Sequence, residues 1–404
     1  MKAAIMGYGT IGSGVYEVLD TNCKSVEKKA GEPIEVKYIL DLREFPGSPV
    51  EKLVIHDVEQ IVNDPEIGIV VETMGGTKPA YEFVKRCLLA GKHVVTSNKA
   101  LVAAHGTELI RIAAEKNISF LFEASVGGGI PIIRPLVESL GGEEILEISG
   151  ILNGTTNYIL TKMNEEGWSF EEALKRAQEL GYAERNPEAD IEGYDTCRKI
   201  AILTAVATGK EVNYEEIPTQ GITKITSMDS SYAAHMGAAI KLFGNSVNKD
   251  GKIYLEVAPV LVDAKDPLYA VTDVFNGILV VGNMLGASMF YGSGAGKLPT
   301  ASAVVADVVD CAKNKGRNIM MSWSEEKLDL LQIDDVKSRF FVRVSGHAAE
   351  RQSEIEELFG KVEIVAVPSL SEEFAFITGE ITEQEYREKA EKLDGIQSRI
   401  RARI

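Results

Sequence analysis

The glycine pattern near the start of the chain constrains the fold most. Residues 7–12 read Gly-Tyr-Gly-Thr-Ile-Gly, directly after the apolar run Ala3–Met6 and at the opening of the amphipathic stretch Ile11–Leu19. Glycines at this spacing allow a tight strand-to-helix turn and let backbone N–H groups approach a pyrophosphate at the positive end of the helix dipole. Because strand and helix are both in place, the pattern predicts a dinucleotide-binding turn. Its predicted residues are Gly7, Gly9, Thr10, Ile11 and Gly12.

The rest of the first third alternates short apolar runs with amphipathic stretches. Strands separated by helices of this length build a parallel, doubly wound sheet, so we predict an α/β Rossmann domain. Both faces of such a sheet are covered, which fits the nearly continuous apolar run Ile67–Val71. The further predicted strands are Val36–Leu40, Leu53–Ile55, His93–Thr96 and Ile118–Phe122, and the helices are Pro79–Ala90 and Gly106–Lys116.

Beyond about Glu123 the pattern changes to a second, mixed α/β domain. Glycines cluster at 127–129, a strand is predicted at Ile145–Leu152, and Ser169 with Glu172 forms a capping box before a helix. A late helix at Thr300–Lys313 is placed to return to the first domain. The tail predicts strand, helix, strand, strand, helix, strand, which is the ferredoxin-like order of small regulatory modules. The predicted domains are 1–125 with 300–318, then 126–299, a linker 319–335, and the tail 336–404.

Composition excludes several classes of protein. The formal net charge of −17 over 404 residues argues against binding to nucleic acid or to anionic membranes. No run reaches 18 apolar residues, and the chain enters a strand pattern at once, which leaves no room for a secretory signal. The cysteines Cys23, Cys87, Cys197 and Cys311 are scattered, so we expect reduced thiols, no transition-metal site and a cytoplasmic location.

The end of the second predicted strand carries two residues that affect cofactor choice in opposite directions. Asp41 can accept hydrogen bonds from both ribose hydroxyls, which favours NAD. Arg43 can pair with a 2′-phosphate, which favours NADP. A salt-bridged surface loop explains the same pair without a cofactor. The sequence leaves the preference between NAD and NADP open.

A charged segment begins after residue 180. Asn186-Pro187 and Gly193 mark turns, which predicts that Glu184 and Asp190 lie on irregular chain. Asp195 and Lys199 are four residues apart at the start of a helix, so that both side chains share one face. The simple interpretation is a surface ion pair worth about 0.2–0.5 kcal/mol. The alternative is an acid–base pair, in which burial and a neighbouring charge adjust the lysine for proton transfer.

The segment from Ala177 to Lys199, AQELGYAERNPEADIEGYDTCRK, resembles the signature of homoserine dehydrogenases. The resemblance extends through GYGTIGSGV at the start, TSNKALVA at 96–103, EASVGGGIPII at 123–133, LNGTTNYIL at 152–160 and GSGAGKLPTASAV at 292–304. It covers roughly residues 1–320. It implies an NAD(P)-dependent enzyme that interconverts L-aspartate 4-semialdehyde and L-homoserine in the aspartate pathway to threonine, methionine and isoleucine.

The resemblance also implies residue roles. Lys199 matches the lysine assigned to proton transfer at the hydroxyl, and Lys99 matches a second lysine near nicotinamide and substrate. Four residues match the substrate site: Glu184, Asp190, Asp195 and Thr155. Further cofactor neighbours are Thr73, Gly181 and Gly294. A loop that holds Na⁺ or K⁺, mostly through backbone carbonyls, matches at Glu123, Val126, Gly128 and Ile130.

The chain departs from the family pattern at three places. Arg185-Asn186 stands where many relatives have Pro-Asp, and Leu40 stands where many NADP-preferring relatives have a basic residue. The tail resembles an ACT domain in the order of its elements, but its first helix follows GHAAERQSE, which lacks the usual Asp-x-Pro-Gly turn. An amino-acid effector such as threonine at residues 336–404 is therefore a hypothesis, and a structural tail is the alternative.

Two other classes of function fit parts of the sequence. Another Rossmann oxidoreductase, such as aspartate-semialdehyde dehydrogenase, would need a catalytic thiolate, and no cysteine lies in a glycine-rich loop. A nucleotide-sensing regulatory protein would bind NAD(P) without turnover. We expect a homodimer or homotetramer. The sequence does not decide between these assemblies, between Lys99 and Lys199 as proton carrier, or between the two ions.

Overall fold

The computed structural model describes residues 1–249, 251–319, 323–368 and 370–404, and these form two compact units. The first unit comprises Met1–Glu143, Ala201–Tyr214 and Gly292–Leu328, and the second comprises Glu144–Ile200, Glu215–Tyr291 and Asp329–Ile404. Of the predicted linker 319–335, residues 320–322 lie outside the described residues. Trp323 packs near Phe122 within the first unit. None of the described helices is long and apolar enough to cross a membrane.

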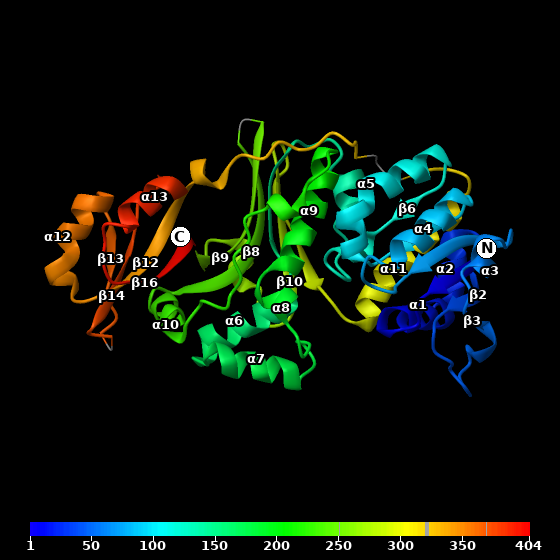
Figure 1. The fold of residues 1–404 in the computed structure, drawn as a ribbon, viewed down its shortest axis with the longest axis horizontal. Coiled ribbons are helices and arrows are strands. Elements are labelled where there is room, and N and C mark those ends of the chain that lie inside the picture. Colours follow the sequence, from blue (N-terminus) through cyan, green and yellow to red (C-terminus); the bar gives the residue numbers. More distant parts are fainter. Residues whose placement is uncertain (250, 320–322, 369) are drawn as a thin grey trace. The chain divides into compact units, whose positions relative to one another are not determined.

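The first unit contains a parallel sheet in the order β3-β2-β1-β4-β5-β6. Figure 1 labels its strands β2, β3 and β6 in the blue and cyan part of the chain. Its direction of winding changes between β1 and β4, which is where doubly wound sheets bind dinucleotides. The predicted Rossmann sheet is confirmed. The strands are β1 (Lys2–Met6), β2 (Glu35–Leu40), β3 (Val54–Ile55), β4 (Ile67–Glu72), β5 (His93–Thr96) and β6 (Phe120–Leu121). The helices are α1 (Thr10–Thr21), α2 (Cys23–Ala30), α3 (Glu59–Val62), α4 (Ala80–Leu89) and α5 (Lys99–Glu115).

Helix α11 (Lys297–Lys313) belongs to the first unit although the second unit intervenes in the chain. It packs on α1, and a Cβ added at Gly14 would approach the Lys297 carbonyl oxygen to 2.9 Å. Val304 and Val308 of α11 join Val15 and the strand residues Ala3 and Ile5 in one buried apolar cluster. This cluster fixes the opening strand and helix that carry the glycine turn.

The second unit is built on a mixed sheet in the order β11-β10-β7-β8-β9-β16-β12-β14-β13, with β15 paired to β12. Ser169 and Glu172 form the predicted capping box at α7. The strands that open this sheet are β7 (Ile145–Ile151), β8 (Ala238–Lys249), β9 (Lys252–Asp263), β10 (Phe275–Gly282) and β11 (Gly286–Ser293). The helices are α6 (Gly154–Glu166), α7 (Phe170–Glu179), α8 (Glu188–Ile191), α9 (Tyr194–Thr208, shared with the first unit) and α10 (Ser227–His235).

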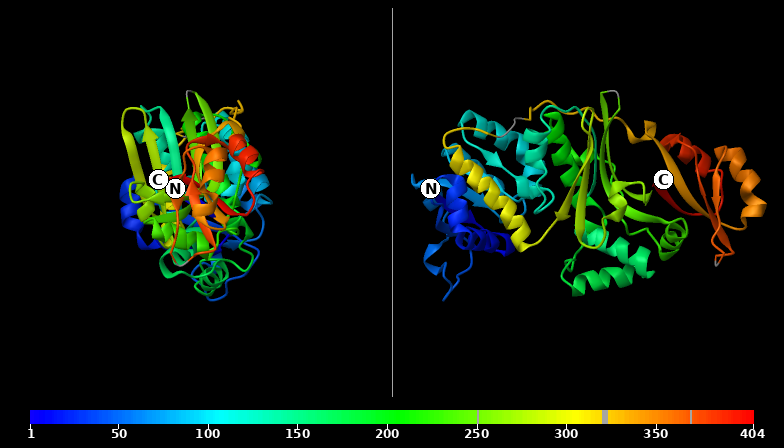
Figure 2. Two further views of the ribbon diagram at one scale, coloured as in Figure 1. Left: turned by 90° about the vertical axis from the view of Figure 1, so that its left-hand side faces the viewer. Right: turned by 180° about the vertical axis from the view of Figure 1, so that it is seen from behind.

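The tail contains the predicted strands and helices with one added two-residue strand, β15, between β14 and α13. Its sheet is continuous with that of the second unit (Figure 2). The last strand runs parallel to β9, with Arg401, Ala402 and Arg403 opposite Val260, Leu261 and Val262. Arg401 also forms ion pairs with Glu256 of β9 (2.7 Å) and with Glu383 (2.8 Å). The tail elements are β12 (Lys337–Ser345), α12 (Ala348–Phe359), β13 (Glu363–Val365), β14 (Glu373–Ile377), β15 (Ile381–Thr382), α13 (Glu383–Ala390) and β16 (Ile396–Arg403).

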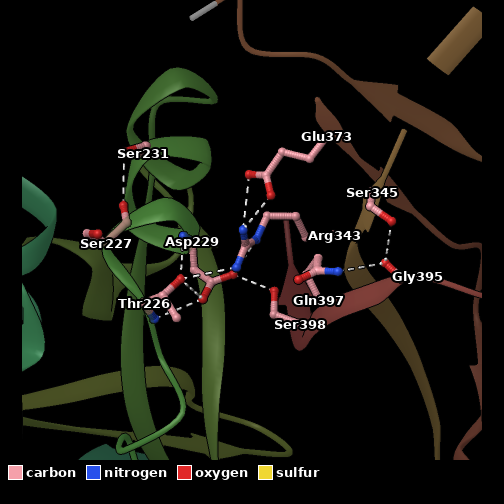
Figure 3. Close-up of polar contacts among 10 residues, drawn as sticks. All are labelled: Thr226, Ser227, Asp229, Ser231, Arg343, Ser345, Glu373, Gly395, Gln397 and Ser398. Atoms are coloured by element: carbon pink, nitrogen blue, oxygen red, sulfur yellow. Dashed lines mark hydrogen bonds and ion pairs between the residues drawn. The ribbon is translucent and has the colours of Figure 1, made fainter. Parts of the chain in front are cut away.

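A buried ion pair also joins the tail to helix α10 (Figure 3). Arg343 of β12 donates from Nε to Asp229 Oδ1 (3.1 Å) and from Nη1 to Glu373 Oε2 (2.7 Å). Asp229 also closes a capping box with Thr226 at the start of α10, and Ser398 of β16 donates to its Oδ1 atom. The carboxylate of Asp229 is therefore shared between the helix start and two tail strands.

Candidate active site

The glycine turn is held by close backbone packing at the start of α1. Gly7 has a φ of 94°, and a Cβ added at Gly12 would lie 1.9 Å from the Gly7 carbonyl oxygen. Thr73, directly after β4, donates from Oγ1 to that same oxygen (2.8 Å). The turn opens α1 at Thr10, with Gly9 as its N-cap residue. It therefore presents the N–H groups and the helix start that a pyrophosphate needs.

Replacing Gly12 with alanine is expected to raise KM for the nicotinamide cofactor at least tenfold. The added methyl group cannot be placed without moving the Gly7 carbonyl, and so the turn loses the shape that admits a phosphate. Steady-state kinetics with varied cofactor checks this. Gly142→Ala is the matched control, since a Cβ at Gly142 meets nothing within 4 Å and its φ is not positive. A cofactor KM within twofold of wild type would contradict the expectation.

Asp41 and Arg43 form an ion pair beside the turn. The Tyr8 backbone N–H donates to Asp41 Oδ2 (2.7 Å), while Arg43 donates from Nε to Oδ1 and from Nη2 to Oδ2, both at 2.9 Å. The Arg43 side chain therefore holds the pKa of Asp41 well below its usual range, assisted by the backbone hydrogen bonds. Arg43 itself stays 59% exposed, so its outer face is open to an anion.

Lys99 is the first residue of α5, directly after a helix cap. Asn98 is the N-cap residue and accepts from the Leu101 N–H through Oδ1 (3.1 Å). The same side chain donates to the Gly76 carbonyl (2.6 Å), which joins the loops that follow β4 and β5. Lys99 thus lies at the carboxyl edge of the parallel sheet, where doubly wound folds bind their ligands.

In the second unit, the structure brings the predicted catalytic residue Lys199 together with two of the predicted substrate residues, Asp190 and Asp195. Lys199 donates to Asp195 Oδ2 and to the Leu152 carbonyl, each at 2.7 Å. Asn153 donates from Nδ2 to Asp195 Oδ2 (2.9 Å) and to Asp190 Oδ1 (2.7 Å). Lys199 is 8% exposed and Asp195 is 3% exposed. The Asp195–Lys199 pair is therefore not a solvated surface pair.

The loop before α8 places the other predicted substrate residues. Thr155, in the first turn of α6, donates to the Tyr182 carbonyl (2.6 Å), directly after Gly181, which has a φ of 76°. Glu184 has an exposed side chain, and its carbonyl accepts from Gln178 Nε2 (3.1 Å). Among the described contacts, no hydrogen bond joins the Glu184 carboxylate to the Asn153 cluster. Asp190 lies in the short helix α8, not on irregular chain, because Pro187 opens a helical turn there.

The predicted cation loop is buried and closely packed in the first unit. The Glu123 carboxylate accepts from the backbone N–H groups of Ile132 (2.6 Å), Ile133 (2.8 Å) and Arg134 (2.8 Å). The Glu123 N–H donates to Asp307 Oδ2 on α11 (2.9 Å). Gly128 has a φ of 55°, and a Cβ there would lie 2.4 Å from the Gly294 carbonyl oxygen. Gly294 is thus a neighbour of this loop.

Two family models match the chain: "Homoserine dehydrogenase, NAD binding domain" over residues 7–123 and "Homoserine dehydrogenase" over residues 131–309. The homoserine dehydrogenase of Synechocystis is 43% identical over 360 residues, which are 85% of this chain and 82% of the relative. The Bacillus subtilis homoserine dehydrogenase is 40% identical over 317 residues, which are 78% of this chain and 73% of the relative. The chain belongs to the homoserine dehydrogenase family.

Solved structures of homoserine dehydrogenases support the same family assignment. The Thiobacillus denitrificans enzyme has a TM-score of 0.91 and 35% identity, and the match covers 100% of this chain and 98% of that chain. A hyperthermophilic archaeal homoserine dehydrogenase in complex with NADPH has a TM-score of 0.66 and 29% identity, and the match covers 77% of this chain and 97% of that chain. The predicted family and activity class are confirmed, in preference to another Rossmann oxidoreductase or a nucleotide-sensing regulatory protein. The chain is an NAD(P)-dependent oxidoreductase that acts on a CH–OH group.

Asn153 is a residue of this cluster that the sequence did not predict. Its side chain contacts both Asp190 and Asp195, and its Oδ1 atom also caps α6 by accepting from the Thr156 N–H (2.9 Å). The sequence signal for Asn153 was a helix-cap pattern, in which an asparagine is followed by Gly-Thr-Thr at the start of a helix. That pattern indicates a cap, but it does not reveal which distant side chains meet the amide.

Proposed function

We propose that the Asp195–Lys199 pair carries the proton-transfer step in the interconversion of L-homoserine and L-aspartate 4-semialdehyde. The supporting observation is the burial of the pair, with Lys199 Nζ held at 2.7 Å by both Asp195 and the Leu152 carbonyl. When bound, NAD(P)⁺ accepts the hydride from the alcohol carbon. Lys199 removes the hydroxyl proton in that direction, and in reverse its ammonium stabilises the charge that builds on the aldehyde oxygen.

The carboxylates of the same unit supply negative charge for the ammonium group of the amino-acid substrate. Asp190 and Asp195 are held together by the Asn153 amide, which keeps two like charges close to one donor. Glu184, exposed on its loop, is proposed to reach the substrate ammonium from the solvent side. Thr155 fixes that loop through the Tyr182 carbonyl. The deciding assay follows absorbance at 340 nm with L-homoserine and either cofactor, and absence of turnover would overturn the proposal.

We propose NADP as the better cofactor. Both Asp41 oxygens are already occupied by Tyr8 and Arg43, whereas the exposed face of Arg43 can receive a 2′-phosphate. Arg43→Ala is expected to lower kcat/KM with NADP at least tenfold and to leave kcat/KM with NAD within about threefold. Kinetics with both cofactors measure the ratio. An equal loss with NAD and NADP would contradict the proposed role.

A monovalent cation, Na⁺ or K⁺, is proposed at the backbone carbonyls of Glu123, Val126, Gly128 and Ile130. The donor set suits a hard cation, because the Glu123 carboxylate is engaged by backbone N–H groups and the loop offers carbonyl oxygen instead. The ion would hold the shape of this loop next to Gly294. Activity and thermal stability in NaCl, KCl and choline chloride at equal ionic strength test the site and the choice of ion.

We further propose a homo-oligomer and keep an amino-acid effector as a hypothesis for the tail. Large apolar side chains are exposed along and beside β11, namely Met284, Leu285, Met289 and Tyr291. Such side chains on a strand at the end of a sheet favour burial against a second copy. Light scattering distinguishes a dimer from a tetramer, and kinetics with threonine at saturating substrate test the effector.

A further inference from the structure

A fully buried glutamate lies beside the cofactor turn and has no part in the mechanism above. Glu72 ends β4 and is opposite Met6 of β1 on one side and Thr96 of β5 on the other. It is 0% exposed. The sheet changes its direction of winding between β1 and β4, so Glu72 stands at the point where a bound dinucleotide crosses the strand ends.

The Glu72 carboxylate fastens the two loops that follow β4 and β5. Its Oε1 atom accepts from the Met74 N–H (2.8 Å), and its Oε2 atom accepts from Thr96 Oγ1 (2.5 Å). Thr96 Oγ1 in turn accepts from the Asn98 N–H (2.9 Å). One carboxylate therefore holds the loop after β4 directly, and the Thr96 hydroxyl links it to the loop after β5.

These hydrogen bonds connect Glu72 to residues that are proposed to act in the reaction. Asn98 caps α5 and donates to the Gly76 carbonyl, and the next residue is Lys99. On the other loop, Thr73 lies between Glu72 and Met74 and supports the Gly7 carbonyl of the cofactor turn. The Glu72 network thus ends at the pyrophosphate turn in one direction and at Lys99 in the other.

Packing alone does not account for an acid at this position. Burying a carboxylate away from water costs free energy, and an apolar side chain would fill the same space without that cost. Burial raises the pKa of Glu72, and hydrogen bonds from Thr96, Met74, Asn98 and Gly75 oppose that rise. The donors are arranged around the acid, which is the pattern of a side chain that sets the positions of its neighbours.

We propose that Glu72 is a positioning residue for hydride transfer, acting through Thr96 and Asn98 to fix Lys99 and the 73–76 loop against the nicotinamide half of the cofactor. The inference rests on the proposed cofactor site but not on which lysine carries the proton. Small displacements of a reacting group can lower the rate of the chemical step by about 10²-fold. Loss of the Glu72 network should therefore affect kcat more than cofactor binding.

The test uses Glu72→Gln, Thr96→Val, Thr96→Ser and the double variant Glu72→Gln/Thr96→Val in the full-length enzyme. Thr96→Val removes the hydroxyl without changing the shape, and Thr96→Ser keeps it. The measurements are kcat, KM for each substrate, NADPH affinity by fluorescence, the deuterium isotope effect with L-homoserine labelled at the alcohol carbon, and the melting temperature. Glu108→Gln on α5 is the control for loss of one acid from the same unit.

We expect Glu72→Gln and Thr96→Val each to lower kcat by about 30- to 100-fold, with cofactor KM within threefold and a larger isotope effect. The double variant should be no slower than either single variant, and Thr96→Ser should recover most of kcat. Three results would overturn the proposal: unchanged kcat, losses that multiply in the double variant, or a fall in kcat that Thr96→Ser does not reverse. If Glu72→Gln fails to fold, the comparison of Thr96→Val with Thr96→Ser still tests the proposal. Failure of the wild-type enzyme in the same assay would instead overturn the proposed function.

Discussion

Replacing Lys199 with methionine is expected to lower kcat by about 10³-fold, because a proton carrier at the reacting oxygen contributes on the order of 10² to 10⁴. Methionine keeps much of the length and packing of the side chain but cannot donate to Asp195 or to the Leu152 carbonyl. The substrate KM should rise far less, since Asn153 still holds Asp190 and Asp195. Steady-state kinetics in both directions measure the two effects separately.

The matched control is Lys162→Met, which removes another lysine four residues from an acid. Lys162 pairs with Glu166 (2.9 Å), and both side chains are more exposed than those of the Asp195–Lys199 pair. Its loss should change kcat less than about twofold, because its described ion pairs, with Glu166 (2.9 Å) and Asp273 (3.2 Å), lie outside the Asn153 cluster. Lys99→Met completes the set. If it removes turnover while Lys199→Met retains it, then the proton-transfer role belongs to Lys99.

The sequence predicts the part of the fold that depends on short-range patterns. The turn at Gly7–Gly12 lies between β1 and α1 as expected, and the Ser169–Glu172 box caps α7. Spacing also places Asp195 and Lys199 on one helix face. It does not reveal whether that face is buried, because burial depends on Leu152 and Asn153, which are more than forty residues earlier in the chain.

Dependence on residues far away in the sequence also explains why the role of Glu72 and the pairing of β16 with β9 were not predicted. Glu72 ends an apolar run and looks like the first polar residue after a strand, yet its donor Thr96 comes from the neighbouring strand. The parallel pairing of β16 with β9 joins segments about 140 residues apart, and no local pattern sets its register. Alternation predicts which residues form a strand and which face they share, whereas the neighbouring strand is decided by side chains far away in sequence.

The contacts between the tail and α10 make a strong prediction about stability. Arg343→Met is expected to weaken tail docking by about 3 kcal/mol, because removing one partner of a buried pair leaves the other charge without compensation. The Arg343 side chain is 7% exposed and that of Asp229 is 0% exposed, so water cannot replace the guanidinium easily. Glu373 retains more access to solvent and should contribute less to the loss. The tail should then open more often at β16 and β12.

Hydrogen exchange of the β16 amides measures this opening directly. A decrease of about 3 kcal/mol in the free energy of opening raises the population of the open state roughly 150-fold, so exchange at the Arg401 and Arg403 amides should accelerate by about 10²-fold. Arg387→Met is the control within the tail, since its pair with Asp334 is exposed on both sides and should contribute less than about 1 kcal/mol. Adding Asp229→Asn to Arg343→Met should restore part of the protection, because the uncompensated charge is gone. Unchanged exchange in Arg343→Met would mean that the β9–β16 pairing and the ion pairs of Arg401 hold the tail without this contact.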